Sequence, residues 1–180
     1  MIDRRVALLR GINVGTAKRI AMADLRKLFE RLGYEDVRTL LNSGNVVFTV
    51  KKKAAGGEGP RIEKEIAGRL GIATRVTIIG GKELAAAIEG NPFRSTADNP
   101  SRMLLMVLED PKTAARLSPL AKERWSPEEF ALSGRIAYLW CPNGILDGRI
   151  WAAASKVLKD TGTARNLSTM TKLLALLAAP

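Results

Sequence analysis

The segment around Gly11 and Gly15 contains residue types that can bind an anion. The run Arg10-Gly-Ile-Asn-Val-Gly15 is followed closely by Lys18 and Arg19. Glycines in such a loop can present backbone N–H groups to an anion, and nearby cations can add charge-assisted hydrogen bonds. The spacing is neither that of the P-loop GxxxxGK[ST] nor that of GxGxxG. Tight-turn glycines explain the same pattern, so both interpretations stay open at this point.

A second polar group occupies a predicted turn. Asn42-Ser43-Gly44-Asn45 lies between two β-rich runs, 37–41 and 46–50, and this arrangement predicts a hairpin. The four turn residues are candidate binding residues because three of them carry hydrogen-bonding side chains. Asn also tolerates left-handed backbone conformations, so the hairpin alone can explain them.

A third candidate group precedes the last predicted helix, 168–177. Arg165 and Lys172 beside a helix N-terminus could hold a phosphate, together with Asn166 and Thr169. Plain N-capping by Asn166 or Ser168 is the alternative explanation.

Other catalytic chemistry has little support in the composition. Histidine is absent, which removes the most frequent general base and metal ligand. One cysteine, Cys141, leaves no internal disulfide, and we expect it to be an inert buried thiol. Adjacent Glu128 and Glu129 would point to opposite faces of a strand, so they make no acid–base pair. We expect neither a metal site nor a cofactor.

The charge of the chain is its most unusual global property. Lys and Arg number 29 against 18 Asp and Glu, which leaves a net charge of +11. A protein this basic attracts polyanions, phosphorylated ligands or acidic partners, although the same charge can simply keep it soluble. No apolar run approaches the length of a membrane span, so we expect a cytoplasmic protein without membrane contact.

The order of predicted elements indicates an α+β fold. The first part has the ferredoxin-like order βαββαβ, from strand 6–9, helix 22–32 and the hairpin to helix 60–70, strand 74–79 and a short helix 82–89. After a linker at 94–101, a second and smaller α+β unit of related order, βαββαα, is expected. We therefore predict a ferredoxin-like domain at 1–98 and a subdomain at 99–180 that ends in two helices.

This topology predicts where the first two candidate groups meet. In a βαββαβ sheet, the end of the first strand and the turn between the second and third lie at the same edge. We therefore expect Arg10, Asn13 and Lys18 to lie near Asn42 and Asn45, with Arg19 and Ser43 beside them.

Four segments together resemble the bacterial domain of unknown function 1697 family. They are Ala7-Leu-Leu-Arg-Gly-Ile-Asn-Val-Gly15, Met22-Ala-Asp-Leu-Arg26, Val37-Arg-Thr with Ser43-Gly-Asn-Val-Val-Phe48, and Thr163-Ala-Arg-Asn166 with Thr169 and Lys172-Leu173. Family members usually have Trp-Asn where this chain has Leu167-Ser168, and often Ser-Lys where it has Gly148-Arg149. Roles that depend on those side chains are therefore not carried over. The family has no established activity, so the resemblance implies none.

The sequence thus favours a non-catalytic binder of an anionic partner, either nucleic acid or a phosphorylated small molecule. One alternative is an enzyme that acts on a small anionic substrate, with Lys18 or Lys172 as an electrostatic clamp. Another is a protein–protein interaction scaffold, for which exposed apolar patches on the second unit would be the sign. No oligomeric state is predicted.

Overall fold

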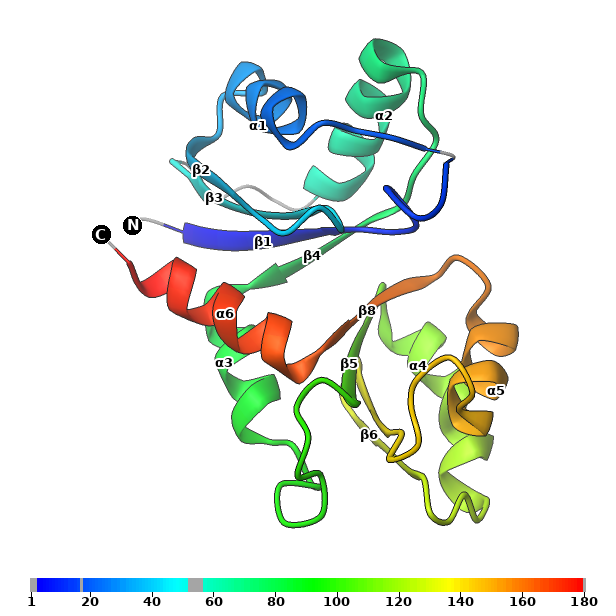
Figure 1. Ribbon diagram of the computed structural model, residues 1–180. Helices are drawn as coiled ribbons and strands as arrows, with labels where there is room; N and C mark the ends of the chain where they lie inside the picture. Colours follow the sequence, from blue (N-terminus) through cyan, green and yellow to red (C-terminus); the bar gives the residue numbers. More distant parts are fainter. Residues whose placement is uncertain (1–2, 17, 52–56, 180) are drawn as a thin grey trace. The chain divides into compact units, whose positions relative to one another are not determined.

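The computed structural model describes residues 3–16, 18–51 and 57–179 and forms two four-stranded antiparallel sheets with helices (Figure 1). The chain divides into two compact units. Unit 1 is Met1–Leu84 with Leu173–Pro180, and unit 2 is Ala85–Lys172. The predicted α+β class is confirmed. No described helix combines the length and apolar character that crossing a bilayer requires.

Unit 1 has the predicted ferredoxin-like order. Its sheet runs β2-β3-β1-β4, with every neighbouring pair antiparallel. Two helices, α1 and α2, cover one face of this sheet (Figure 1). The elements are β1 (Asp3–Leu9), α1 (Met22–Arg31), β2 (Glu35–Leu40), β3 (Asn45–Val50), α2 (Glu58–Leu70) and β4 (Val76–Gly80).

The core of unit 1 lies where the alternating apolar residues of the strands meet the apolar faces of the helices. Alternate strand residues such as Leu9 and Phe48 face the helices. They pack against Leu25, Phe29 and Ile62, which recur at helical spacing. The Phe48 ring lies 5.4 Å from that of Phe29, centroid to centroid. Phe48 is fully buried. This packing holds the end of β1 and the start of β3 in fixed register.

Unit 2 repeats the same topology. Its sheet order is β6-β7-β5-β8, again antiparallel throughout, with α4 and α5 as the two crossover helices. Its elements are β5 (Met103–Leu108), α4 (Pro111–Leu117), the short 3₁₀ helix η1 (Ser118–Lys122), β6 (Glu129–Ser133), β7 (Ile136–Trp140), α5 (Arg149–Leu158) and β8 (Gly162–Asn166).

Strand β8 lies where two successive helices were predicted. Its sequence, GTARN, contains one β-branched residue and no aromatic, so local propensity gave no signal. The segment is a strand because it pairs with β5, where Val107 lies opposite Thr163 and Leu105 opposite Arg165. The order of the second unit is therefore βαββαβ followed by a helix.

A helix follows the last strand of each sheet: α3 (Gly81–Glu89) and α6 (Leu167–Ala178). The sequence analysis divided the chain between residues 98 and 99, in a polar loop. The compact units are instead divided inside these two helices, after Leu84 and after Lys172. Long-range contacts explain why the end of α6 belongs to unit 1: the Arg4 guanidinium donates to the carbonyls of Leu177 at 2.6 Å and Ala179 at 2.9 Å.

Candidate anion-binding site

The segment after β1 and the β2–β3 turn lie side by side in unit 1. The Asn13 side-chain amide donates to the Asn42 carbonyl at 2.7 Å, and the Leu9 N–H donates to the Gly44 carbonyl at 2.8 Å. The predicted proximity of the two segments is therefore confirmed (Figure 1). We call the described residues of 10–21 together with 41–45 the rim.

Asn13 organises the rim through its side chain. Its amide also donates to the Ile20 carbonyl at 2.9 Å, and its Oδ1 accepts from the Ile20 N–H at 2.8 Å. Its backbone N–H donates to the Lys18 carbonyl at 3.0 Å. Asn13 has φ 55°, a left-handed conformation that asparagine tolerates better than most residues. Asn13 thus closes the loop and ties it to the turn, so its role here is structural.

We expect Asn13→Ala to lower the free energy of unfolding by about 2–3 kcal/mol. The variant loses three side-chain hydrogen bonds, each worth about 1 kcal/mol, and places alanine in a left-handed conformation. Urea unfolding followed by circular dichroism measures the change. Asn143→Ala, at an exposed position of unit 2, is the matched control and should be nearly neutral. Equal midpoints for the two variants would contradict this role of Asn13.

The turn residues shape the hairpin more than they offer a ligand surface. A Cβ on Gly44 would lie 2.7 Å from Ile12 Cδ1 and 2.8 Å from Leu9 Cβ, and its φ is 77°, so only glycine fits. Asn45 is buried and donates to the Leu40 carbonyl at 2.8 Å and to Ser43 Oγ at 3.0 Å. Of the predicted turn residues, Asn42 and Ser43 are exposed.

The glycines and cations of the rim face solvent. Gly11 and Gly15 are exposed, with φ 63° and 64°, and Lys18 and Arg19 are exposed as well. In the part of the chain that the structure describes, no ion pair joins Lys18 or Arg19 to a carboxylate. Residues 4–23 contain no Asp or Glu at all. The positive charge of this loop is therefore not neutralised by its own segment.

Arg10 has a different environment at the base of the rim. It is half-buried, its N–H donates to the Arg75 carbonyl at 2.9 Å, and its carbonyl accepts from Thr74 Oγ1 at 2.8 Å. Arg75 in turn forms an ion pair with Glu63 at 3.3 Å. The backbone of Arg10 therefore links the rim to the strand β4 side of the sheet.

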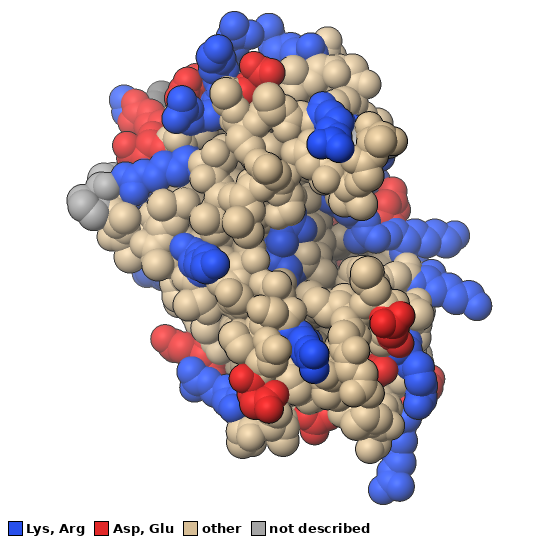
Figure 2. Space-filling model, in the orientation of Figure 1, with Lys and Arg blue, Asp and Glu red and all other residues tan. Residues whose placement is uncertain are grey.

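Many other arginines of the chain stabilise the fold. Their guanidinium groups donate to backbone carbonyls, in three cases near a helix C-terminus, where cations also complement the helix dipole. These arginines are Arg4 at the end of α6, Arg61 just after α1, Arg116 near the end of α5, Arg102 at Pro142 and Arg135 at Leu108. Figure 2 shows Lys and Arg distributed over the face drawn, with Asp and Glu among them. The net charge of +11 thus overstates the charge available for binding.

The length of the rim loop is not required by the fold. In unit 2 the equivalent connection, from β5 to α4, consists of residues 109–110, whereas β1 and α1 are joined by residues 10–21. Both connections serve the same βαββαβ topology. Long loops on a rigid scaffold are frequently functional, so the extra residues are the strongest topological reason to place a site here.

The third predicted group does not belong to the rim. Arg165, Asn166, Thr169 and Lys172 lie in unit 2. Asn166 Oδ1 accepts from the Thr169 N–H at 2.9 Å, which is the N-capping arrangement of α6. The Arg165 guanidinium donates to the neighbouring carbonyl of Ala164 at 2.8 Å, and Lys172 is exposed. Capping therefore accounts for Asn166 and Thr169.

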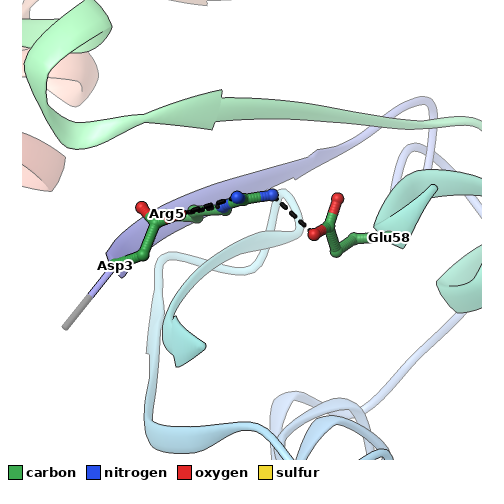
Figure 3. A network of polar contacts seen from close by, with 3 residues as sticks. All are labelled: Asp3, Arg5 and Glu58. Atoms are coloured by element: carbon green, nitrogen blue, oxygen red, sulfur yellow. Dashed lines mark hydrogen bonds and ion pairs between the residues drawn. The ribbon is translucent and has the colours of Figure 1, made fainter. Parts of the chain in front are cut away.

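Sequence reasoning missed two groups of residues. Val14 and Leu41 are exposed apolar side chains within the rim, 72% and 53% accessible. A partly buried ionic cluster lies at the other end of β1, where Arg5 contacts Asp3 at 2.6 Å and the buried Glu58 at 2.5 Å (Figure 3). The hydrogen bond to Asp3 raises the pKa of Arg5 despite its partial burial. No local pattern marks this cluster, because Glu58 is far from Arg5 in sequence.

The remaining candidates for chemistry have structural roles. Cys141 is buried, as predicted, and burial and, to a smaller extent, the charge of Glu128 raise its pKa to about 11, which disfavours the reactive thiolate at neutral pH. Glu128 accepts from the N–H groups of Arg149 and Ile150 at the start of α5, while Glu129 accepts from Thr96 Oγ1. Within the described residues, no group of His, Cys, Asp and Glu could hold a metal ion. Lys51 begins the run Lys51-Lys-Lys53 and forms an ion pair with Glu35, while Lys52 and Lys53 lie outside the described residues.

Comparisons with known proteins agree on the fold and leave the activity open. The family model described as a protein of unknown function, DUF1697, matches residues 2–138. No curated protein matches the sequence. Among solved structures, the conserved bacterial protein SP0830 from Streptococcus pneumoniae is similar, with 21% sequence identity and a TM-score of 0.75. The match covers 98% of this chain and 99% of that one, and at this identity it shows the shared fold alone.

Proposed function

Because this chain belongs to the DUF1697 family, a family of unknown function, we propose a function from its own residues: it is a non-catalytic binder of phosphate groups. The partner is nucleic acid or a phosphorylated small molecule, and it binds at the rim. Both partners present the same chemistry, a phosphate that accepts hydrogen bonds from fixed cations and backbone N–H groups. We also propose that the protein is located in the cytoplasm.

The single observation that carries this proposal is the environment of Lys18 and Arg19. Both are exposed cations without a described carboxylate partner, and they lie on a loop that Asn13 ties to the hairpin turn. Tying the loop down reduces the entropy lost when a ligand fixes these side chains. Elsewhere in the chain, many arginines already donate to backbone carbonyls.

Backbone groups near these cations add to the case. The glycines at 11 and 15 leave the loop backbone accessible to a ligand. The N-terminus of α1 follows directly, and its N-cap residue, Ala21, makes no side-chain capping bond. The partial positive charge of the helix N-terminus has the sign that a phosphate requires, but the exposed carboxylate of Asp24 in the first turn opposes it, so the accessible loop backbone is the main contribution.

The residue types of the rim favour binding over catalysis. Segments 10–21 and 41–45 contain no Asp, Glu, His, Cys or Tyr, so the rim carries no side chain suited to general acid–base or covalent carboxylate chemistry at neutral pH. Its side chains are cations, amides, hydroxyls and apolar groups. Such a set can recognise and position a phosphate.

Salt dependence of binding tests the proposal. A fluorescently labelled single-stranded oligonucleotide and a labelled polyphosphate of similar length are titrated with the protein at low and rising salt. If Arg10, Lys18 and Arg19 neutralise phosphates, log K against log[salt] should fall with a slope of about −2 for the single strand. Titration with inorganic pyrophosphate and mononucleotides then separates a small-molecule ligand from a polyanion. Absence of binding to all of these probes at low salt would refute the proposal.

A further inference from the structure

Two exposed apolar residues belong to the rim, which also carries the exposed cations Lys18 and Arg19. Among the residues that the structure describes, the large exposed apolar side chains are Val14, Leu41 and Leu146, at 72%, 53% and 90% accessibility. Val14 follows Asn13, and Leu41 precedes Asn42. Since Asn13 donates to the Asn42 carbonyl at 2.7 Å, the first two apolar side chains flank one hydrogen bond. Both residues therefore belong to segments of the rim that this hydrogen bond holds together.

The backbone of Leu41 gives this residue a further significance. Leu41 has φ 57°, a left-handed conformation that glycine or asparagine adopts more readily than leucine. Its side chain is more than half exposed, so burial in the fold compensates little of this strain. An exposed apolar residue held in an unfavourable conformation contributes little to stability. Such outliers concentrate at functional sites.

We propose that Val14 and Leu41 contact the bases of a single-stranded nucleic acid whose phosphates lie on Lys18 and Arg19. This inference rests on the proposed phosphate-binding function and selects one of its two ligand classes. A single strand presents phosphates and unstacked, flat apolar rings in alternation, which matches a rim that carries cations and apolar groups. The exposed side chains of Asn42 and Ser43 can add hydrogen bonds to base edges.

Other ligands match this surface less well. A small phosphorylated metabolite without a ring has no apolar surface that could contact Val14 or Leu41. Double-stranded nucleic acid keeps its bases stacked, so their faces are not available to Val14 or Leu41. A protein partner offers no phosphate to the cations and the accessible glycine backbone of the rim.

The decisive experiment separates contacts to bases from contacts to phosphates. Affinity is measured by fluorescence anisotropy for an oligothymidylate and for an abasic oligomer with the same number of phosphates. The wild-type protein should bind the oligothymidylate about tenfold more tightly, because covering one exposed aliphatic side chain with a base contributes about that factor. Leu41→Asn should reduce this difference several-fold, because only the Val14 contact remains, and should leave the affinity for the abasic oligomer unchanged.

Thermal stability provides an independent readout of the same variant. Asparagine tolerates the left-handed conformation, so Leu41→Asn should raise Tm by about 2–4 °C while it weakens binding to the oligothymidylate. Leu146→Asn is the control, since Leu146 is also an exposed leucine but lies in unit 2. It should change neither the affinity nor the preference for bases.

The possible outcomes distinguish this inference from the proposed function. Equal binding of the oligothymidylate and the abasic oligomer by the wild-type protein would overturn the base contact and leave phosphate binding in place. A stabilised Leu41→Asn variant with unchanged oligothymidylate affinity would also overturn it. Failure of both oligomers to bind would refute the proposed function, and this inference with it.

Discussion

Reversing the charges of Lys18 and Arg19 together is expected to weaken the binding of phosphate-containing ligands about 100-fold at low ionic strength. Each side chain is exposed and has no described carboxylate partner, so in the free protein its charge is available to a ligand. Charge-assisted hydrogen bonds contribute about 1.5–3 kcal/mol each, and the reversal replaces attraction by repulsion. Lys18→Glu/Arg19→Glu therefore removes most of the affinity that the rim supplies.

The salt dependence of this variant identifies the cause of the loss. Removal of two phosphate contacts should reduce the slope of log K against log[salt] by about 1.4 for a single strand. The matched control is Lys122→Glu/Arg124→Glu, which changes the net charge by the same amount at exposed positions of unit 2. If the control weakened binding as much as the rim variant, binding would depend on overall charge and the rim would have no special role.

Removal of the Glu58 carboxylate is expected to lower the free energy of unfolding by about 3 kcal/mol. Glu58 is 6% exposed, and its Oε1 lies 2.5 Å from an Arg5 guanidinium nitrogen whose side chain is 16% exposed (Figure 3). Breaking a buried pair leaves a charge without compensation, which typically costs 3–5 kcal/mol. Arg5 retains Asp3 at 2.6 Å, so we expect the lower end of that range for Glu58→Ala.

The same helix offers a matched control for Glu58→Ala. Glu65, also in α2, pairs with Arg69 at 2.6 Å, but both side chains are much more exposed. Glu65→Ala should therefore change the stability by less than about 0.5 kcal/mol in urea unfolding. The double variant Arg5→Met/Glu58→Leu should recover much of the loss, because apolar residues of similar size can replace a buried pair. Equal effects of Glu58→Ala and Glu65→Ala would show that the buried cluster contributes no more than a surface pair.

Local sequence patterns predicted most of unit 1. The apolar run that ends at Leu9, the helical spacing of Leu25 and Phe29, and the Asn-Ser-Gly turn each carried a signal that the structure confirms. From these elements the ferredoxin-like order followed, and with it the proximity of the segments around Asn13 and Asn42. Two residues of the turn were assigned as binding residues although they shape the hairpin: Gly44 fills a space without room for a Cβ, and Asn45 is buried.

The features that escaped prediction depend on partners distant in sequence. Strand β8 has weak strand propensity and forms because β5 provides a ladder for it. The Arg5–Glu58 pair joins residues that no local pattern connects. The exposure and left-handed backbone of Leu41 follow from the way the turn meets the loop after β1, and sequence alone predicts neither.

The sequence by itself determined the fold class, the family and the residue types of the rim. These follow from short-range periodicity, from turn chemistry and from motifs, which are local properties of the chain. Only the tertiary structure decided which of the many positive charges are available to a ligand. An arginine that donates to a carbonyl far away in sequence, as Arg4 does to Leu177, has the same formal charge as Arg19, and their roles separate only when the folded chain brings those acceptors together.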